Sequence, residues 1–273
     1  MQRLSALKYY GGKSPLSNNV HIHKRIFELL RVQGRVYMEP FAGMLSMLLN
    51  RPKASTEIVN DKSDRIVAFW KALRDEPDEF LRKFSCTPMS ETLFLESVDD
   101  LDNDRLEGVD KAVAVALCIT AGLMSTAYPD RTKFGFSFYS IKASKAALHD
   151  RLLLVSKRIE DVVITNRCAI KLLDKARQHE DAVIYVDPPY WGADTSPYGS
   201  ENTIDFDALK DVLRGHKAKI VLSNYGDFFD DLDWRKENLS AMVANGAASN
   251  TKATPRTEVL YYNFDPPNPC LFD

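Results

Sequence analysis

Short apolar runs alternate with amphipathic stretches along the first 74 residues of the chain. The runs at residues 35–41 and 56–60 predict two buried β-strands. Residues 44–50 have helical character, and residues 63–73 predict a helix whose apolar side chains recur at helical spacing. This order of strand, helix, strand and helix is typical of a parallel sheet.

The same alternation returns after residue 150. Helices are predicted up to residue 159 and at residues 169–178 and 206–216, with strands at residues 162–165, 182–186, 219–223 and 258–264. We expect the last of these strands to be antiparallel and to lie at the edge of the sheet. Both ends of the chain therefore contribute to one α/β sheet of the Rossmann-like type.

Residues 75–150 interrupt this alternation. Their acidic stretch, residues 91–110, is interpreted as a solvated helical face, and residues 109–124 predict a buried helix. We predict a larger domain built from residues 1–74 and 151–273, and a small, mainly helical domain inserted at residues 75–150.

The composition excludes several classes of protein. Hydrophobic residues make up 45% of the chain, and no apolar stretch approaches the ~18 residues of a membrane span. The four cysteines are scattered, with no CxxC pair or nearby His cluster, which indicates reduced thiols and no metal site. His21 and His23 are interpreted as solvated residues at the start of a helix. We expect a cytoplasmic protein, in a bacterium or a phage-infected host, that is a monomer or a weak dimer.

The charge is segregated along the chain. A net charge of −2 argues against a surface that is basic throughout. Residues 1–36 carry +6, residues 128–158 carry +5, and residues 91–110 carry −7. The second basic stretch interleaves cations with rings, among them Arg131, Lys133 and Phe136, which suits phosphates and unstacked bases. Any nucleic-acid surface is therefore expected on the two basic stretches, although rings of this kind also fill protein cores.

Two of the loops that follow predicted strands carry a weak signal for a cofactor. In an open parallel sheet, ligands bind beyond the carboxyl ends of the strands. After the first strand, Gly43 permits a tight turn and close approach of a ligand. Asp61 ends the next strand, about 20 residues further on, where a carboxylate can accept hydrogen bonds from ribose hydroxyls.

The turn Asp187-Pro188-Pro189-Tyr190 is a much sharper signal. Two prolines stiffen the chain after a buried strand, which leaves the Asp187 carboxylate and the Pro188 carbonyl as fixed acceptors beside an aromatic ring. Two such acceptors can hold both N–H bonds of a planar exocyclic amine and favour the pyramidal geometry that makes its nitrogen nucleophilic. Tyr190 could stack on the nucleic-acid base that carries such an amine. A proline-rich turn with an Asp cap is the structural alternative.

These motifs resemble the amino-group DNA methyltransferases that use S-adenosylmethionine, specifically the Dam-like, D12 class, adenine-N6 branch with its DPPY motif. Residues 8–13 resemble the amino-terminal cofactor motif, residues 39–46 the glycine loop, residues 60–61 the ribose site, and residues 221–225 the motif that lines the base pocket. A phosphate-loop interpretation of residues 11–14 fails because that motif requires a glycine where Leu7 stands.

The resemblance implies methyl transfer from S-adenosylmethionine to adenine N6 in double-stranded DNA, by base flipping and direct transfer. It implies that the catalytic residues are Asp187, Pro188, Pro189 and Tyr190, and we expect cofactor contacts from Tyr9, Lys13, Glu39, Phe41, Gly43, Asp61 and Asp187. Together with the basic stretch, we expect nucleic-acid contacts from Arg131, Lys133, Phe136 and Asn224. The larger domain would then bind the cofactor and catalyse the reaction, and residues 75–150 would recognise the target.

The sequence departs from the family pattern at several positions. Leu45 replaces a second glycine, which is expected to narrow the cofactor's approach, and Cys168 replaces an acid that reads the cofactor's adenine. Ala121 and Ser125 stand where the family offers Asn and Arg to DNA. Cytosine-N4 methylation and a non-catalytic DNA-binding module that keeps the fold therefore remain open alternatives.

Overall fold

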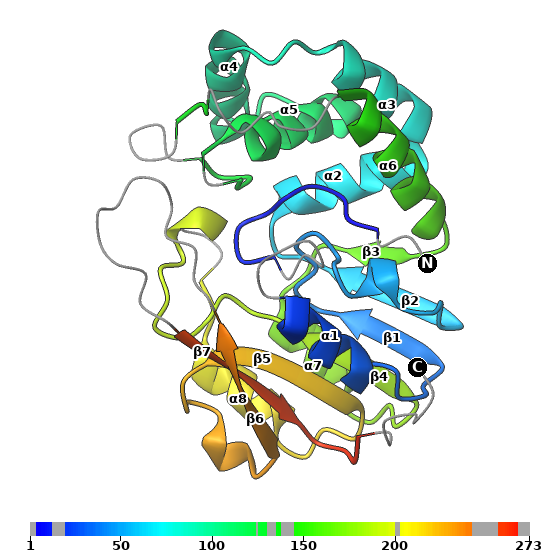
Figure 1. Ribbon diagram of the computed structural model, residues 1–273, viewed down its shortest axis with the longest axis vertical. Helices are drawn as coiled ribbons and strands as arrows, with labels where there is room; N and C mark the ends of the chain where they lie inside the picture. Colours follow the sequence, from blue (N-terminus) through cyan, green and yellow to red (C-terminus); the bar gives the residue numbers. More distant parts are fainter. Residues whose placement is uncertain are drawn as a thin grey trace.

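A mostly parallel sheet forms the centre of the molecule (Figure 1). The computed structural model describes residues 4–12, 20–123, 125–129, 135–137, 145–199, 203–241 and 256–266. In this part of the chain seven strands pair in the order β3-β2-β1-β4-β5-β7-β6. They are β1 (Val36–Glu39), β2 (Thr56–Asn60), β3 (Val163–Thr165), β4 (Ala182–Val186), β5 (Lys219–Tyr225), β6 (Arg235–Ala241) and β7 (Arg256–Tyr262).

The first five strands in this order are parallel, whereas β7 is antiparallel to both of its neighbours. The predicted α/β sheet is thus present, and so is the antiparallel direction of the last strand. Its predicted position at the edge was wrong, because β6 pairs with the outer side of β7. The sequence of β6 is largely polar and lacks the apolar pattern that marked the other strands.

The faces of the sheet are buried in alternation, as the two-residue period of a strand requires. In β4, Val183 and Tyr185 belong to one core, whereas Ile184 and Val186 belong to the core on the other face. The helices α1 (Val20–Leu29) and α2 (Asp64–Asp75) cover the first face, and α7 (Ala169–Ala176) and α8 (Phe206–Leu213) cover the second.

A layer of helices lies beyond α2, between β2 and β3 in the sequence (Figure 1). It consists of α3 (Pro77–Cys86), α4 (Glu91–Asp102), α5 (Gly108–Ala121) and α6 (Lys145–Arg158). Its buried residues belong to the same core as the first face of the sheet, and α6 crosses the predicted boundary at residue 150. The acids of residues 91–110 are exposed or half-buried, as predicted. No helix among the described residues is long and apolar enough to span a membrane.

Two local predictions were wrong. Residues 44–50 form only a short 3-10 helix, Leu48–Asn50, because Gly43 and Leu45 both have positive φ, which a right-handed helix cannot accommodate. His23 is buried on the inner side of α1, and only His21 is exposed.

Candidate active site

Three loops that carry the candidate residues leave the sheet at the same edge, the one formed by the carboxyl ends of the parallel strands. β1, β2 and β4 are parallel neighbours, so their carboxyl ends lie together. The order of the strands reverses between β1 and β4, and such a switch point is where open α/β sheets bind ligands. Gly43 follows β1, Asp61 follows β2, and Asp187 follows β4.

Asn60, the last residue of β2, ties three of these loops together. Its buried side chain donates from Nδ2 to the carbonyls of Pro40 and Arg167, both at 2.9 Å. Its Oδ1 accepts from the Arg167 backbone N–H at 2.9 Å and from the Thr165 hydroxyl at 2.8 Å. The loops after β1, β2 and β3 are therefore held in a fixed relation by one amide group.

The Asp61 carboxylate organises the glycine loop. Its Oδ2 accepts from the backbone N–H of Gly43 at 3.0 Å, and its Oδ1 accepts from that of Ser63 at 2.9 Å. The Trp70 indole N–H donates to the Gly43 carbonyl at 2.8 Å and holds the loop from the other side. Burial raises the pKa of Asp61 to about 6, although these N–H donors oppose the shift. The Lys62 backbone N–H also contributes a hydrogen bond, so these three donors leave the carboxylate about one further acceptor site for a ligand hydroxyl.

Tyr9 lies against the same loop. A Cβ atom on Gly43 would lie 3.9 Å from the Tyr9 ring, and burial, together with the nearby Asp61, raises the pKa of Tyr9 well above its ordinary value. Tyr9 also packs edge-on against Tyr198, with ring centroids 6.4 Å apart. The structure therefore brings Tyr9, Gly43 and Asp61 together, as the sequence predicts.

Glu39 supports the loop from inside the core. It is 2% exposed, and its Oε1 accepts from the Tyr37 hydroxyl and from the Leu48 backbone N–H, both at 2.7 Å. Burial raises the pKa of Glu39 to about 8, and the negative charge of Asp187 adds to the shift. These contacts anchor the 3-10 helix that follows the glycine loop. Contact of Glu39 with a cofactor stays a prediction.

Replacing Glu39 by Gln should make the protein more stable at alkaline pH. The native carboxyl titrates near pH 8 and the unfolded one near its ordinary value of 4.5, so the native state binds more protons between these values. Stability that depends on Glu39 therefore falls as the pH rises through this range. Gln keeps an acceptor for Tyr37 and Leu48 but cannot ionise.

We expect Glu39→Gln to match the wild type near pH 5 and to exceed its free energy of unfolding by about 2–4 kcal/mol near pH 9. Urea denaturation followed by circular dichroism at the two pH values measures this difference. An equal pH dependence in both proteins would contradict it.

The turn after β4 is held by its own tyrosine. Asp187 is half-buried, and its Oδ1 lies 3.0 Å from the Tyr190 hydroxyl, which is also 2.8 Å from Oε1 of Glu258 on β7. The Tyr190 ring packs perpendicular to that of Tyr225 on β5, with centroids 4.4 Å apart. Pro188 is buried and Pro189 is half-buried.

Asn224 fixes the far end of this turn. It is fully buried on β5, and its Oδ1 accepts from the Trp191 backbone N–H at 3.0 Å. Its Nδ2 has no hydrogen-bond partner among the described residues, so a donor remains available beside the turn. The structure thus places Asn224 next to the predicted catalytic residues, where it supports the chain.

Several residues of this edge were missed by the motif comparison. Thr126 donates from its hydroxyl to the Pro197 carbonyl, which links the end of the helical layer to the loop after Tyr190. The Tyr128 and Ser63 hydroxyls are 2.7 Å apart, and Arg65 stacks on the Tyr128 ring. Tyr128 belongs to the stretch with interleaved rings, but neither its spacing nor that of Thr126 marks these contacts.

The remaining predicted residues either lie outside the described part of the chain or pack against other hydrophobic side chains. Lys13, Arg131 and Lys133 lie outside the described residues. Phe136 is half-buried and packs edge-on against Phe94 of α4, with centroids 5.9 Å apart. Phe41, also half-buried, packs against the core beneath the second face of the sheet. Contacts of these residues with cofactor or nucleic acid stay predictions.

Leu45 does not narrow the glycine loop, contrary to the sequence-based expectation. Its side chain is 1% exposed and belongs to the hydrophobic core, so its bulk points away from the open side of the loop. The strain lies in the Leu45 backbone instead, because its φ of +52° is disfavoured for residues other than glycine.

Two other residues that depart from the family pattern are also described by the structure. Cys168 is exposed at the N-cap of α7, and Ser125 has a φ of +49°.

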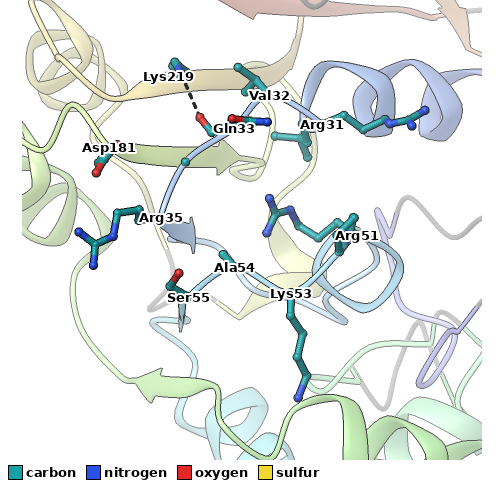
Figure 2. A pocket seen from close by; sticks show the side chains of 13 residues that line it. Arg31, Val32, Gln33, Arg35, Arg51, Lys53, Ala54, Ser55, Asp181 and Lys219 are labelled. Atoms are coloured by element: carbon teal, nitrogen blue, oxygen red, sulfur yellow. Dashed lines mark hydrogen bonds between the residues drawn. The ribbon is translucent and has the colours of Figure 1, made fainter. Parts of the chain in front are cut away.

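A separate cleft opens at the opposite edge of the sheet. Figure 2 shows Arg35, Arg51 and Lys219 among its lining residues, close to the amino ends of β1, β4 and β5. Its volume is about 590 Å³. None of the candidate site residues lines it, so the cleft is distinct from the candidate active site.

The sequence matches the family described as D12 class N6 adenine-specific DNA methyltransferase over residues 9–245. The chain belongs to this family. It is therefore an adenine-specific DNA methyltransferase, and S-adenosylmethionine is its methyl donor, as the resemblance of its motifs implies. The Rossmann-like fold class is confirmed as well. A comparison with curated proteins found no match.

Two solved structures resemble this methyltransferase in outline. The precorrin 8w decarboxylase of Methanobacterium thermoautotrophicum is 11% identical, with a TM-score of 0.38 over 92% of this chain and 94% of that one. A putative methyltransferase from Streptococcus mutans, in complex with SAH, is 7% identical, with a TM-score of 0.33 over 90% and 99% of the two chains. Similarities this remote add nothing to the assignment.

The residues near Gly43 suit the methyl donor of this methyltransferase. Asp61 offers a carboxylate that backbone donors hold in place and that keeps an acceptor site for a ligand hydroxyl, and the space beside Gly43 is bounded by the Tyr9 ring. Among the described residues, no group of three or more His, Cys, Asp or Glu side chains is arranged to hold a metal ion.

Proposed function

We propose that the turn Asp187–Tyr190 holds the N6 amine of an adenine flipped out of double-stranded DNA. The observation that carries this proposal is the position of Asp187. It directly follows β4 at the edge of the sheet where Asp61 and Gly43 follow the neighbouring strands. The amine-binding turn and the cofactor loops thus share one edge, as a direct transfer between them requires.

In this proposal the turn orients the amine. The Asp187 carboxylate and the Pro188 carbonyl accept its two N–H bonds, which favours the pyramidal geometry in which the lone pair is on nitrogen. The prolines keep both acceptors fixed before the base arrives. Because the nitrogen itself attacks, the chain needs no nucleophilic cysteine.

Tyr190 would stack on the flipped base, which is worth about 1–3 kcal/mol and offsets part of the cost of unpairing it. The residue is only 8% exposed. Side chains over its ring must therefore move when the base enters.

Tyr9, Lys13, Phe41, Gly43 and Asp61 would hold the cofactor. Asp61 would accept hydrogen bonds from its ribose hydroxyls, and Lys13 would pair with its carboxylate. When bound, S-adenosylmethionine supplies a methyl group that a neutral amine can accept directly: the N–C bond forms as the S–C bond breaks, the positively charged sulfur leaves as a neutral thioether, and the nitrogen releases one proton.

The two basic stretches would bind DNA, and residues 75–150 would recognise the target sequence. Arg131 and Lys133 would contact phosphates. Because the chain is not basic throughout, the salt dependence of binding should be that of a few phosphate contacts.

Nucleoside mass spectrometry tests this function. We expect the purified wild-type protein, given S-adenosylmethionine and double-stranded DNA, to produce N6-methyladenine. N4-methylcytosine would instead identify cytosine as the target. Absence of any methylated base, together with no cofactor binding by calorimetry, would indicate a non-catalytic DNA-binding protein and overturn the proposal.

A further inference from the structure

Glu258 is a buried carboxyl group that none of the motifs predicts. It lies on β7, paired in register with Tyr225 of β5, and is 3% exposed. A carboxyl group in the interior of a sheet destabilises the fold unless it is hydrogen-bonded. Its buried position in the strand therefore calls for a specific partner.

That partner belongs to the proposed amine-binding turn. Oε1 of Glu258 is 2.8 Å from the Tyr190 hydroxyl, which is 3.0 Å from Oδ1 of Asp187. The hydroxyl has one hydrogen, so both contacts are hydrogen bonds only when one of the two carboxyl groups carries a proton. Glu258 is the more deeply buried of the two carboxyl groups.

The surroundings restrict this arrangement further. Asp187, Glu258 and Glu39 all act electrostatically on the nearby Tyr185, whose hydroxyl is 3.0 Å from Oγ of Ser223. Burial is the main reason that the pKa of Tyr190 lies well above its ordinary value, and the two carboxyl groups add to it. Tyr190 therefore stays protonated and connects Glu258 to Asp187.

We propose that Glu258 is a positioning residue for methyl transfer, holding the Tyr190 hydroxyl and thereby fixing the Tyr190 ring and the Asp187 carboxylate. This inference rests on the proposed role of the turn. It adds that the antiparallel strand β7 shapes the amine site through the hydrogen bond between Glu258 and Tyr190.

Replacing Glu258 by Leu tests the inference. The single-turnover rate of methylation should fall about tenfold to a hundredfold, because a small displacement of reacting groups has effects of this size. Cofactor affinity should not change. The melting temperature should stay the same or rise, since an apolar side chain replaces a buried carboxyl group. A purely structural role would instead lower stability and activity together.

Glu258→Gln should recover most of the lost rate, because an amide can both donate to and accept from the Tyr190 hydroxyl. Tyr190→Phe removes that hydroxyl and should slow the reaction in a protein that retains Glu258. If Glu258 acts through Tyr190, adding E258L to Y190F should cause no further loss. Tyr262→Phe is the matched control, because Tyr262 on the same strand donates to Glu237 at 2.6 Å, away from the turn.

Wild-type activity separates this inference from the proposed function. If the wild type methylates adenine but E258L is equally fast, or if the losses in E258L and Y190F multiply in the double variant, the inference is wrong. If E258L does not fold, the rates of E258Q, Y190F and the E258Q/Y190F double variant decide, since a further loss when E258Q is added to Y190F would also overturn the inference.

Discussion

Replacing Asp187 by Ala should abolish detectable formation of N6-methyladenine, a loss of about a thousandfold in the single-turnover rate. The variant keeps the prolines and the Pro188 carbonyl but removes the charged acceptor on which the amine depends. The measurement is nucleoside mass spectrometry of DNA incubated with saturating S-adenosylmethionine. The fold should persist, because Asp187 is half-buried at the edge of the sheet.

Asp181→Ala is a matched control for this prediction. Asp181 is exposed and precedes β4, whereas Asp187 follows it, so the two substitutions remove the same charge at opposite ends of one strand. Only the substitution at residue 187 should stop methylation. A D187A protein that methylates DNA at the wild-type rate would exclude the proposed role of the turn.

Replacing Asp61 by Ala should weaken the binding of S-adenosylmethionine about 30- to 100-fold, as measured by calorimetry. The substitution removes the acceptor for the ribose and also releases the Gly43 N–H that the carboxylate holds. Because burial raises the pKa of Asp61 to about 6, the wild-type carboxylate gains a proton between pH 7 and pH 5. Wild-type affinity should therefore fall as the pH is lowered through this range, and D61A should lack this dependence.

Asp64→Ala provides the comparison for D61A. Asp64 carries the same charge three residues further on, but it is exposed in the first turn of α2 and pairs with Lys111 at 2.6 Å. Its removal should leave cofactor affinity and its pH dependence unchanged. If both variants bind the cofactor as tightly as the wild type, Asp61 does not hold the ribose.

The parts of the site that the sequence predicts are those with local signals. Asp187 follows a continuous apolar run, and Asp61 ends a short strand, so the rule that ligands bind at the carboxyl ends of parallel strands places both at one edge. The contact of Glu258 with Tyr190 has no such signal, because it depends on pairing between β5 and β7 across a long stretch of chain. β6 escaped prediction for a related reason, since its polar sequence gains its structure from pairing with β7.

The sequence pattern also failed to predict the local backbone conformation of the glycine loop. A comparison of residue types alone predicts that Leu45 obstructs the approach of the cofactor to the glycine loop. In the structure its positive φ turns the side chain into the core. The apolar pattern of residues 44–50 suggested a helix for the same reason, because periodicity reports burial and not φ.

The hydrogen bonds of Asn60 close a long excursion of the chain through the helical layer. The chain leaves the sheet after Asn60, passes through helices α2 to α6 and strand β3, and returns to the same side chain at Arg167. An excursion of this length begins and ends at one amide. The start of the Asp61 loop is therefore fixed to the loop after β3 by a contact between residues that are 107 positions apart in the sequence.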